Sequence, residues 1–251
     1  MKTSLMAHLV AGYPTYELSL ETARGLVAGG ASFLEIQFPF SDPSADGPAI
    51  QAACTQALAA GFKVDDGWRL VAKVRGEFPM VPVFVMSYAS IVVTKGVEAF
   101  VAQAKAEGVT GLIIPDLAPG ADEGLAVAGK KHGVSIVPVI VPSVPASRLE
   151  KLLADNPEWV YTAIRAGITG VHTTLTPELK AFLSALNART KVMAGFGIDT
   201  AQQVRDLATS AHTIVVGSAL VRVVAAAFEQ GGIMAVRPAV KNKVLELLSP
   251  I

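Results

Sequence analysis

Short apolar runs alternate with longer amphipathic segments along the whole of this 251-residue sequence. The apolar runs are rich in β-branched residues, which is typical of strands buried in a parallel sheet. The segments between them repeat apolar residues every three or four positions, which predicts helices with one buried face. The pattern predicts eight strands, at residues 5–11, 33–38, 81–88, 111–115, 135–141, 159–164, 191–196 and 213–217. Predicted helices include residues 19–30, 94–108 and 236–248, and one that begins after an N-cap at Thr176.

Eight strand–helix units in a chain of this length predict an α/β fold, a (β/α)8 TIM barrel that occupies residues 1–251 as a single domain. A doubly wound sheet is the competing architecture, but its first strand is usually followed by a glycine-rich fingerprint. The segment AGYPTY after the first predicted strand has a single glycine. In a TIM barrel the functional groups lie at the C-terminal ends of the strands and in the loops that follow. Polar residues at those positions are therefore candidate catalytic or binding residues.

The composition excludes several classes of protein. Basic and acidic residues number 21 each, so the chain has no electrostatic footprint for nucleic acid or an anionic membrane. Apolar runs are shorter than the roughly 18 residues of a membrane span, and the N-terminal run is interpreted as a strand rather than a signal peptide. Cys54 is the only cysteine, and the four histidines lack the spacing of metal ligands. We expect a cytoplasmic protein without a disulfide or a bound metal.

A carboxylate, Glu35, interrupts the apolar run FLEIQF of the second predicted strand. Side chains alternate along a strand, so Glu35 and Gln37 share one face, which we expect to point into the barrel near its top. The other face carries Leu34, Ile36 and Phe38, whose apolar side chains suit the helices outside the barrel. A desolvated carboxylate has a raised pKa and can act as a general acid near neutral pH. The structural alternative is a buried glutamate that is paired with a basic residue or caps a backbone amide.

The loop SDPSADGP follows this strand directly and contains Asp42 and Asp46. Aspartates are ordinary turn residues, and the prolines around them fix φ and stiffen the loop. We expect Asp46 to reach back over the same barrel mouth as Glu35. Two carboxylates in different environments can divide the roles of acid and base.

Glycine-rich segments follow the last three predicted strands: RAGITG at 165–170, GFGID at 195–199 and VGSAL at 216–220. Glycine lets backbone N–H groups approach a ligand, and Ser218 opens a predicted helix whose N-terminus attracts anions. Phosphate sites of TIM barrels lie at the loops after strands seven and eight, so the segments together predict phosphate binding. Tyr88, Tyr161 and Phe196 lie in or at the ends of predicted strands, where core packing and a ligand pocket explain them equally well.

Several segments together resemble one family. The stretch FLEIQFPFSDPSADGPAIQ is similar to the signature E-x-G-x-P-F-S-D-P-x-A-D-G-P of the tryptophan synthase alpha subunit. LVAGYP, MSYAS, LIIPDL, RAGITG, AGFGI and VVGSALV occur in the family's order and approximate spacing, so the resemblance covers nearly the whole chain. It implies a TIM barrel that cleaves indole-3-glycerol phosphate to indole and glyceraldehyde 3-phosphate without a cofactor.

The resemblance also assigns roles to individual residues. Glu35 would protonate C3 of the indole, and Asp46 would stabilise the charge that develops at the ring N–H. The implied catalytic residues are Glu35, Asp46 and Tyr161; the phosphate-binding residues are Gly170, Phe196, Gly197, Gly217 and Ser218; the substrate pocket and its closing loop contain His8, Tyr88, Ile113 and Thr169. The implied partner is a β subunit that binds pyridoxal phosphate in an α2β2 heterotetramer, contacted by Pro39 and Asp42 and by loop 166–174.

Some positions depart from the family pattern. Gln37 stands where the family usually has glycine and is expected to add volume beside Glu35, while His8 stands where phenylalanine is frequent. Ser90 replaces an asparagine toward the partner surface, and the family's leading helix is expected to be absent because the first strand begins near residue 5. Two alternatives stay open. One is a regulatory alpha-like partner with little chemistry. The other is a different phosphosugar-binding barrel enzyme, which usually needs a catalytic lysine on a strand or a pair of aspartates at strand ends; the predicted strands have no inward lysine.

Overall fold

The computed structural model describes residues 4–164, 175–195 and 197–249. Its strands are parallel and form one sheet in the order β5-β4-β3-β2-β1-β9-β8-β7-β6. The strands are β1 (Leu5–Val10), β2 (Phe33–Gln37), β3 (Val83–Met86), β4 (Gly111–Ile113), β5 (Ser135–Ile136), β6 (Val139–Ile140), β7 (Trp159–Ala163), β8 (Lys191–Gly195) and β9 (Thr213–Val216). The helices are α1 (Tyr16–Ala28), α2 (Pro48–Ala59), α3 (Val64–Glu77), α4 (Ala89–Lys95), α5 (Val97–Ala106), α6 (Leu125–His132), α7 (Ala146–Leu153), α8 (Pro177–Asn187), α9 (Ala201–Leu207), α10 (Ser218–Gly231) and α11 (Ile233–Leu248).

One extended segment closes the sheet into a barrel. β5 and β6 stand at opposite ends of the strand order, yet only Val137 and Pro138 separate them in the chain. The N–H of Val137 donates to the carbonyl of Leu112 at 2.9 Å, and the N–H of Tyr161 donates to the carbonyl of Pro138 at 2.9 Å. The segment therefore pairs with β4 on one side and β7 on the other, and Pro138, which has no N–H, interrupts it. The predicted strand 135–141 is one barrel strand in two pieces, and the predicted (β/α)8 barrel is confirmed.

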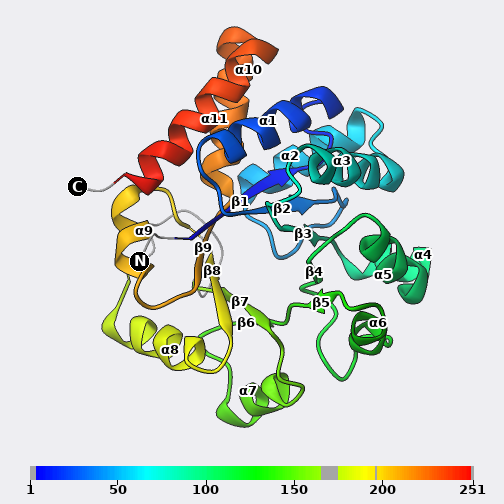
Figure 1. Cartoon of the computed structure of the whole chain (residues 1–251), viewed down its shortest axis with the longest axis vertical. Helices are drawn as coiled ribbons and strands as arrows, with labels where there is room; N and C mark the ends of the chain where they lie inside the picture. The colour runs from blue at the N-terminus through cyan, green and yellow to red at the C-terminus, as the bar shows by residue number, and fades with distance from the viewer. Residues whose placement is uncertain (1–3, 165–174, 196, 250–251) are drawn as a thin grey trace.

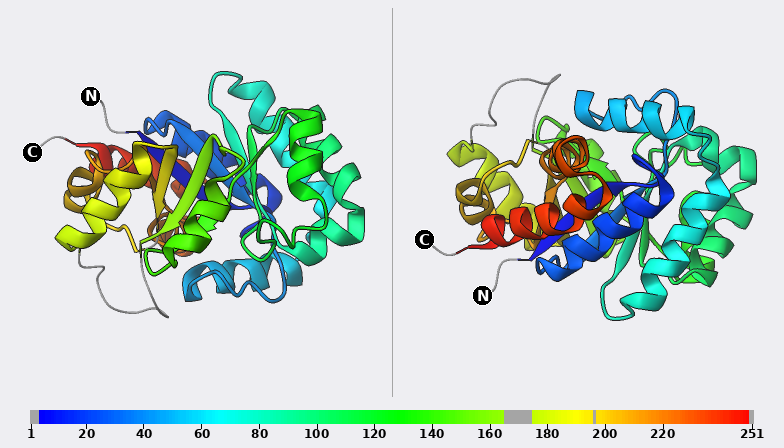
Figure 2. Two further views of the ribbon diagram at one scale, coloured as in Figure 1. Left: turned by 90° about the horizontal axis from the view of Figure 1, so that it is seen from below. Right: turned by 90° about the horizontal axis from the view of Figure 1, so that it is seen from above.

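Helices surround the strands on all sides, as Figure 1 shows. The turned views show that α2, in light blue, lies across one end of the strands (Figure 2). Among the described residues, no helix combines the length and the apolar character that crossing a bilayer requires.

The apolar core has an outer and an inner layer. Leu34, Ile36 and Phe38 belong to the outer layer, between the strands and the helices, as their alternation in β2 predicts. The ring of Phe38 lies 4.8 Å from the ring of Trp68 on α3 in an edge-on arrangement. A separate cluster fills the barrel interior, with Met6, Phe84, Met86, Trp159, Tyr161 and Met193 among its members. The inward direction of Glu35 in β2 follows from the same alternation.

Of two helix starts predicted from the sequence, the structure confirms one and contradicts the other. Thr176 caps α8 as predicted, because its hydroxyl oxygen accepts a hydrogen bond from the N–H of Leu179 at 3.3 Å. The predicted helix 94–108 is wrong at its start, since α5 begins at Val97 and a separate helix, α4, ends at Lys95. Gly96 lies between them with φ +84°, a left-handed conformation that a continuous α-helix cannot contain.

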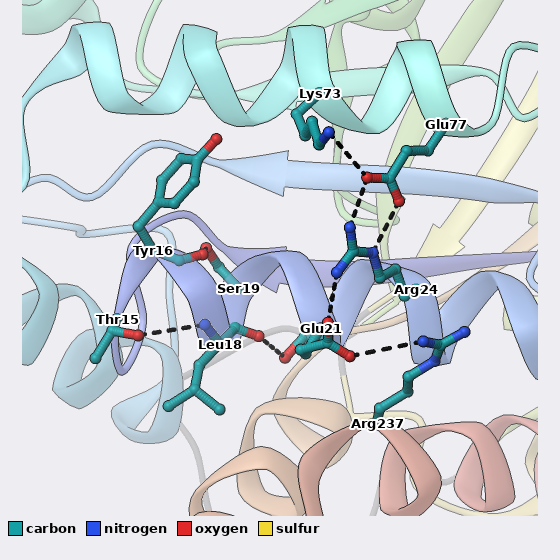
Figure 3. A network of polar contacts seen from close by, with 10 residues as sticks. Thr15, Tyr16, Leu18, Ser19, Glu21, Arg24, Lys73, Glu77 and Arg237 are labelled. Carbon is teal, nitrogen blue, oxygen red and sulfur yellow. Dashed lines mark hydrogen bonds and ion pairs between the residues drawn. The ribbon is translucent and has the colours of Figure 1, made fainter. Parts of the chain in front are cut away.

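A network of charged side chains ties α1 to two neighbouring helices (Figure 3). Arg24 of α1 donates from Nε and Nη2 to the two carboxylate oxygens of Glu77 on α3, at 2.8 and 2.6 Å. Its Nη1 donates to Glu21 at 2.5 Å, and Glu21 lies 3.8 Å from Nη1 of Arg237 on α11. An arginine that donates two hydrogen bonds to one carboxylate fixes the relative orientation of the two helices and also attracts them.

Candidate active site

A cavity of about 520 Å³ opens at the C-terminal ends of the strands. Its size lies within the range of small-molecule sites. Both predicted carboxylates, Glu35 and Asp46, line it. The described residues around it also include His8, Ser44, Ala45, Gly47, Ile50, Gln51, Met86, Ile113, Pro115, Val139, Val141, Tyr161, Ala163, Gly197, Gly217 and Ser218. The structure thus brings together predicted residues from several separate segments of the chain.

Glu35 has a basic neighbour inside the barrel. His8 of β1 and Glu35 of β2 are register partners, and Nδ1 of His8 lies 3.4 Å from Oε2 of Glu35. Both residues are buried, with 3% and 4% of their surface exposed. Burial by itself lowers the pKa of His8, but the carboxylates of Glu35 and Asp46 outweigh burial and hold the pKa above 6.5. The basic partner of a buried glutamate is therefore present, and it lines the cavity too.

Asp46 is held by hydrogen bonds from two strands. Its Oδ2 atom accepts from Nε2 of Gln37, at the end of β2, and from the hydroxyl of Tyr88, which follows β3, each at 2.7 Å. Nε2 of Gln51 donates to the main-chain carbonyl of Asp46 at 2.8 Å. Burial raises the pKa of the Asp46 carboxyl above its ordinary value, although the donors Tyr88 and Gln37 and the charge of His8 act in the opposite direction.

Tyr88 and Gln37 do not line the cavity formed by the described residues. Tyr88, which stays a predicted residue of the substrate pocket, is fully buried, and its hydroxyl also accepts from the N–H of Ala45 at 3.2 Å. Gln37 was expected to add volume beside Glu35, but its amide points toward Asp46 and toward the thiol of Cys54, 3.5 Å away. Gln37 therefore contacts a residue that lines the cavity, Asp46, without lining the cavity itself.

Gly195 makes room for Tyr161. The ring of Tyr161 lies at the cavity, and a methyl group in place of the Gly195 hydrogen would lie 2.5 Å from its hydroxyl oxygen. Burial raises the pKa of Tyr161 far above its ordinary value, and Glu35 and Asp46 add to the effect. The sequence pattern assigned Gly195 to a phosphate-binding segment and missed this packing role.

Backbone from two glycine-rich segments lines part of the cavity. Gly197 follows β8, and Gly217 and Ser218 follow β9 and open the 14-residue helix α10. The partial positive charge of a helix N-terminus makes this position suitable for an anion. Gly170 and Phe196, also predicted to bind phosphate, and Thr169 with the predicted closing loop 166–174 lie outside the described residues.

Comparison with known proteins identifies the family. Residues 1–247 match the family model for the tryptophan synthase alpha chain. The chain belongs to the tryptophan synthase alpha chain family. A tryptophan synthase alpha chain of Helicobacter hepaticus is 40% identical over 228 residues, which cover 88% of this chain and 85% of that protein. The corresponding chain of Opitutus terrae is 37% identical over 222 residues, which cover 88% and 83%.

Solved structures of the tryptophan synthase family agree with this assignment. A tryptophan synthase structure from Mycobacterium tuberculosis has a TM-score of 0.86 at 30% identity, covering 98% of this chain and 91% of that one. A structure from Pyrococcus furiosus, described as the tryptophan synthase α2β2 complex, has a TM-score of 0.86 at 31% identity, covering 98% and 97%. The resemblance predicted from the sequence motifs is confirmed.

The loop after β2 differs in exposure between its two predicted partner-contact residues. Pro39 is buried within the chain, whereas Asp42 is exposed, as is Ser90 at the start of α4. Of the two predicted contact residues in this loop, Asp42 is therefore the one with an exposed side chain. No cluster of three or more metal-binding side chains occurs in the described part of this alpha chain.

Proposed function

We propose that this chain cleaves indole-3-glycerol phosphate to indole and glyceraldehyde 3-phosphate, as the alpha subunit of tryptophan synthase in tryptophan biosynthesis. Its membership of the tryptophan synthase alpha chain family supports the proposal. The observation that carries it is that Glu35 and Asp46 line one cavity together with Gly217 and Ser218 at the start of α10. This combination suits an aromatic ring that is joined to a phosphorylated three-carbon chain.

Glu35 carries the two proton transfers of the proposed reaction. As a general acid it protonates C3 of the indole, which leaves the ring cationic. The resulting carboxylate then takes the proton of the side-chain hydroxyl on the carbon next to C3. The O–H electrons form the aldehyde carbonyl of glyceraldehyde 3-phosphate, and the electrons of the broken carbon–carbon bond return to the ring to release indole. These steps balance without a cofactor.

Asp46 stabilises the positive charge that the ring acquires. That charge reaches the ring nitrogen, and a carboxylate placed at the N–H favours the cationic state and can accept its proton. Asp46 lines the same cavity as Glu35 and is held in place through Oδ2. Tyr161 lines the cavity from β7, the strand between β6 and β8. Its side chain is proposed to support the indole ring of the substrate or the Glu35 side chain.

The phosphate of the substrate is proposed to bind at the glycine-rich backbone. Gly197, Gly217 and Ser218 line the cavity, and the α10 dipole favours an anion there. Gly170 and Phe196 stay predicted phosphate ligands, and Thr169 stays a predicted member of a closing loop.

We propose that the chain works as one TIM-barrel domain, in the cytoplasm, with a β subunit that holds pyridoxal phosphate. The Pyrococcus furiosus relative is described as an α2β2 complex, which supports the same assembly here. The exposed side chain of Asp42, in the loop that also carries Asp46, is the proposed contact through which a β subunit influences the active site.

The test is an assay of indole release from indole-3-glycerol phosphate by the purified chain, alone and with a β subunit. Glu35→Gln is the matched variant, because it keeps the volume of the side chain and removes the transferable proton. We expect release by the wild-type chain and loss of release by Glu35→Gln, with unchanged circular dichroism. Wild-type protein that releases indole under neither condition would contradict the proposal, and full activity of Glu35→Gln would remove Glu35 from the mechanism.

A further inference from the structure

Gln37 is a buried polar residue that the proposed chemistry does not use. It is the last residue of β2, where it pairs in register with Val10 of β1 and Met86 of β3. None of its surface is exposed, so its side chain is confined between the β2 loop and helix α2. A confined side chain on a central strand is well suited to fix the position of a neighbour.

Within the described residues, only the NH2 group of the Gln37 amide forms a hydrogen bond, and its carbonyl oxygen does not. Nε2 donates to Oδ2 of Asp46 at 2.7 Å and approaches the thiol of Cys54 at 3.5 Å. Oε1 is buried and has no hydrogen-bond partner among the described residues. A buried acceptor without a partner is destabilising, so an amide is costly here as a simple core residue. What this amide contributes is its donor, which is directed at a carboxylate.

Both side-chain hydrogen bonds to the Asp46 carboxylate end on the same oxygen. Gln37 approaches Oδ2 from β2, and Tyr88 approaches it from the end of β3, also at 2.7 Å. Two donors from different strands fix the carboxylate more tightly than one, because rotation about the side-chain bonds breaks at least one hydrogen bond. With Oδ2 occupied in this way, Oδ1 is the oxygen left for a ligand.

We propose that Gln37 is a positioning residue which, together with Tyr88, anchors Oδ2 of Asp46 so that Oδ1 receives the ring N–H of the substrate. This inference rests on the proposed function, in which Asp46 stabilises charge at that nitrogen. Gln37 itself does not line the cavity that the described residues form, so it acts through Asp46. Gln37 thus adds a second anchor to the carboxylate beside Tyr88.

The principal test is Gln37→Met, which keeps a side chain of similar volume and removes the donor. We expect kcat for indole release to fall about tenfold while KM changes less than about twofold, since charge stabilisation and not phosphate binding is lost. The dissociation constant of glycerol 3-phosphate, a probe of the phosphate end alone, should stay unchanged. Gln56→Met, an exposed residue of α2, is the control and should keep wild-type rates. Wild-type kcat in Gln37→Met would overturn the inference.

A pH profile separates positioning from a loss of core packing. Among the described residues, the groups that interact with Asp46 are Gln37 and the titratable side chains of His8, Glu35, Cys54, Tyr88 and Tyr161. Among them, the donors Gln37 and Tyr88 favour the ionised carboxylate, so Gln37→Met should move the acid limb of kcat/KM to higher pH. An acid limb that stays in place while activity falls uniformly would overturn the inference. Gln37→Leu serves the same comparison if Gln37→Met does not fold.

A crystal structure of Gln37→Met makes the result independent of the proposed reaction. We expect the Asp46 carboxylate to leave its wild-type position or to occupy more than one rotamer. An Asp46 that is superimposable on the wild-type residue would overturn the anchoring role, whatever the activity. Absence of indole release by wild-type protein would instead count against the proposed function.

Discussion

His8 and Glu35 face each other across β1 and β2, with Nδ1 of His8 3.4 Å from Oε2 of Glu35 inside the barrel. Neighbouring parallel strands place register partners side by side, so two residues 27 positions apart in the chain form a buried pair at the cavity. The imidazole gives the proposed catalytic acid a titratable neighbour.

The His8–Glu35 pair makes stability depend on pH with a definite sign. The pKa of His8 is raised above 6.5, because the carboxylates of Glu35 and Asp46 outweigh the lowering effect of burial. The protonated imidazole therefore stabilises the fold fully below pH 6.5, and this contribution is lost as the pH rises through the raised value. The measurement is the free energy of unfolding of wild type and His8→Phe in urea. The amount by which wild type is more stable than His8→Phe should be larger at about pH 5.5 than at about pH 8.5. A difference that is constant over this range would contradict the pairing.

Gly195→Ala should displace Tyr161. The added methyl group would lie 2.5 Å from the hydroxyl oxygen of Tyr161 and 3.0 Å from a side-chain atom of Val215, so the ring must move into the cavity. We expect indole release to fall about tenfold, because a misplaced group near the reacting atoms costs transition-state stabilisation. Gly76→Ala in α3 is the control, since its methyl group would meet nothing within 4 Å and should leave activity unchanged. Equal activity of the two variants would show that Tyr161 tolerates the displacement.

Ser218→Asp should weaken phosphate binding. Ser218 is the first residue of α10 and lines the cavity, so a carboxylate there competes for the helix N-terminus and repels an anion. We expect the dissociation constant of glycerol 3-phosphate, measured by calorimetry, to rise at least about tenfold. Ser184→Asp adds the same charge on an exposed position of α8 and should leave binding unaltered. Unchanged binding in Ser218→Asp would place the phosphate elsewhere.

Arg24→Met should loosen the contact between α1 and α3. Arg24 makes two hydrogen bonds to Glu77, and about a quarter of each side chain is exposed, at 27% and 25%. We expect a loss of about 1 kcal/mol in the free energy of unfolding, and a coupling with Glu77→Gln in a double-mutant cycle. Arg189→Met is the control, because its pair with Glu150 has similar geometry but is more exposed, so its loss should be smaller. Additive effects of Arg24→Met and Glu77→Gln would show that the pair is not coupled.

Cys54 should be chemically inert in the folded protein. Its thiol is fully buried, and burial together with the charge of Asp46 raises its pKa to about 12. Alkylation requires the thiolate, so iodoacetamide at about pH 8 should not modify the native chain, whereas denatured chain should react. Mass spectrometry measures both. Rapid modification of native protein would mean that α2 opens readily.

Much of the fold and part of the site follow from local sequence. The apolar runs predict the barrel strands to within a few residues, because strand alternation and helical periodicity are properties of neighbouring positions. The same alternation places Glu35 inward and Phe38 outward, as observed. The family signature and the glycine-rich segments identify residues that do line one cavity, among them Asp46, Gly217 and Ser218.

Tertiary structure alone decides how these residues contact one another. The split of strand 135–141 at Pro138 depends on which strands pair with each half. The pairing of His8 with Glu35 depends on the register of β1 and β2, and the space for Tyr161 depends on Gly195 of the adjacent strand. Gln37 was expected to add volume beside Glu35, and the structure shows that its amide donates to Asp46. Sequence periodicity defines the face on which a side chain lies, whereas its partner is set by strand register and loop path, which bring residues from distant segments within hydrogen-bonding distance.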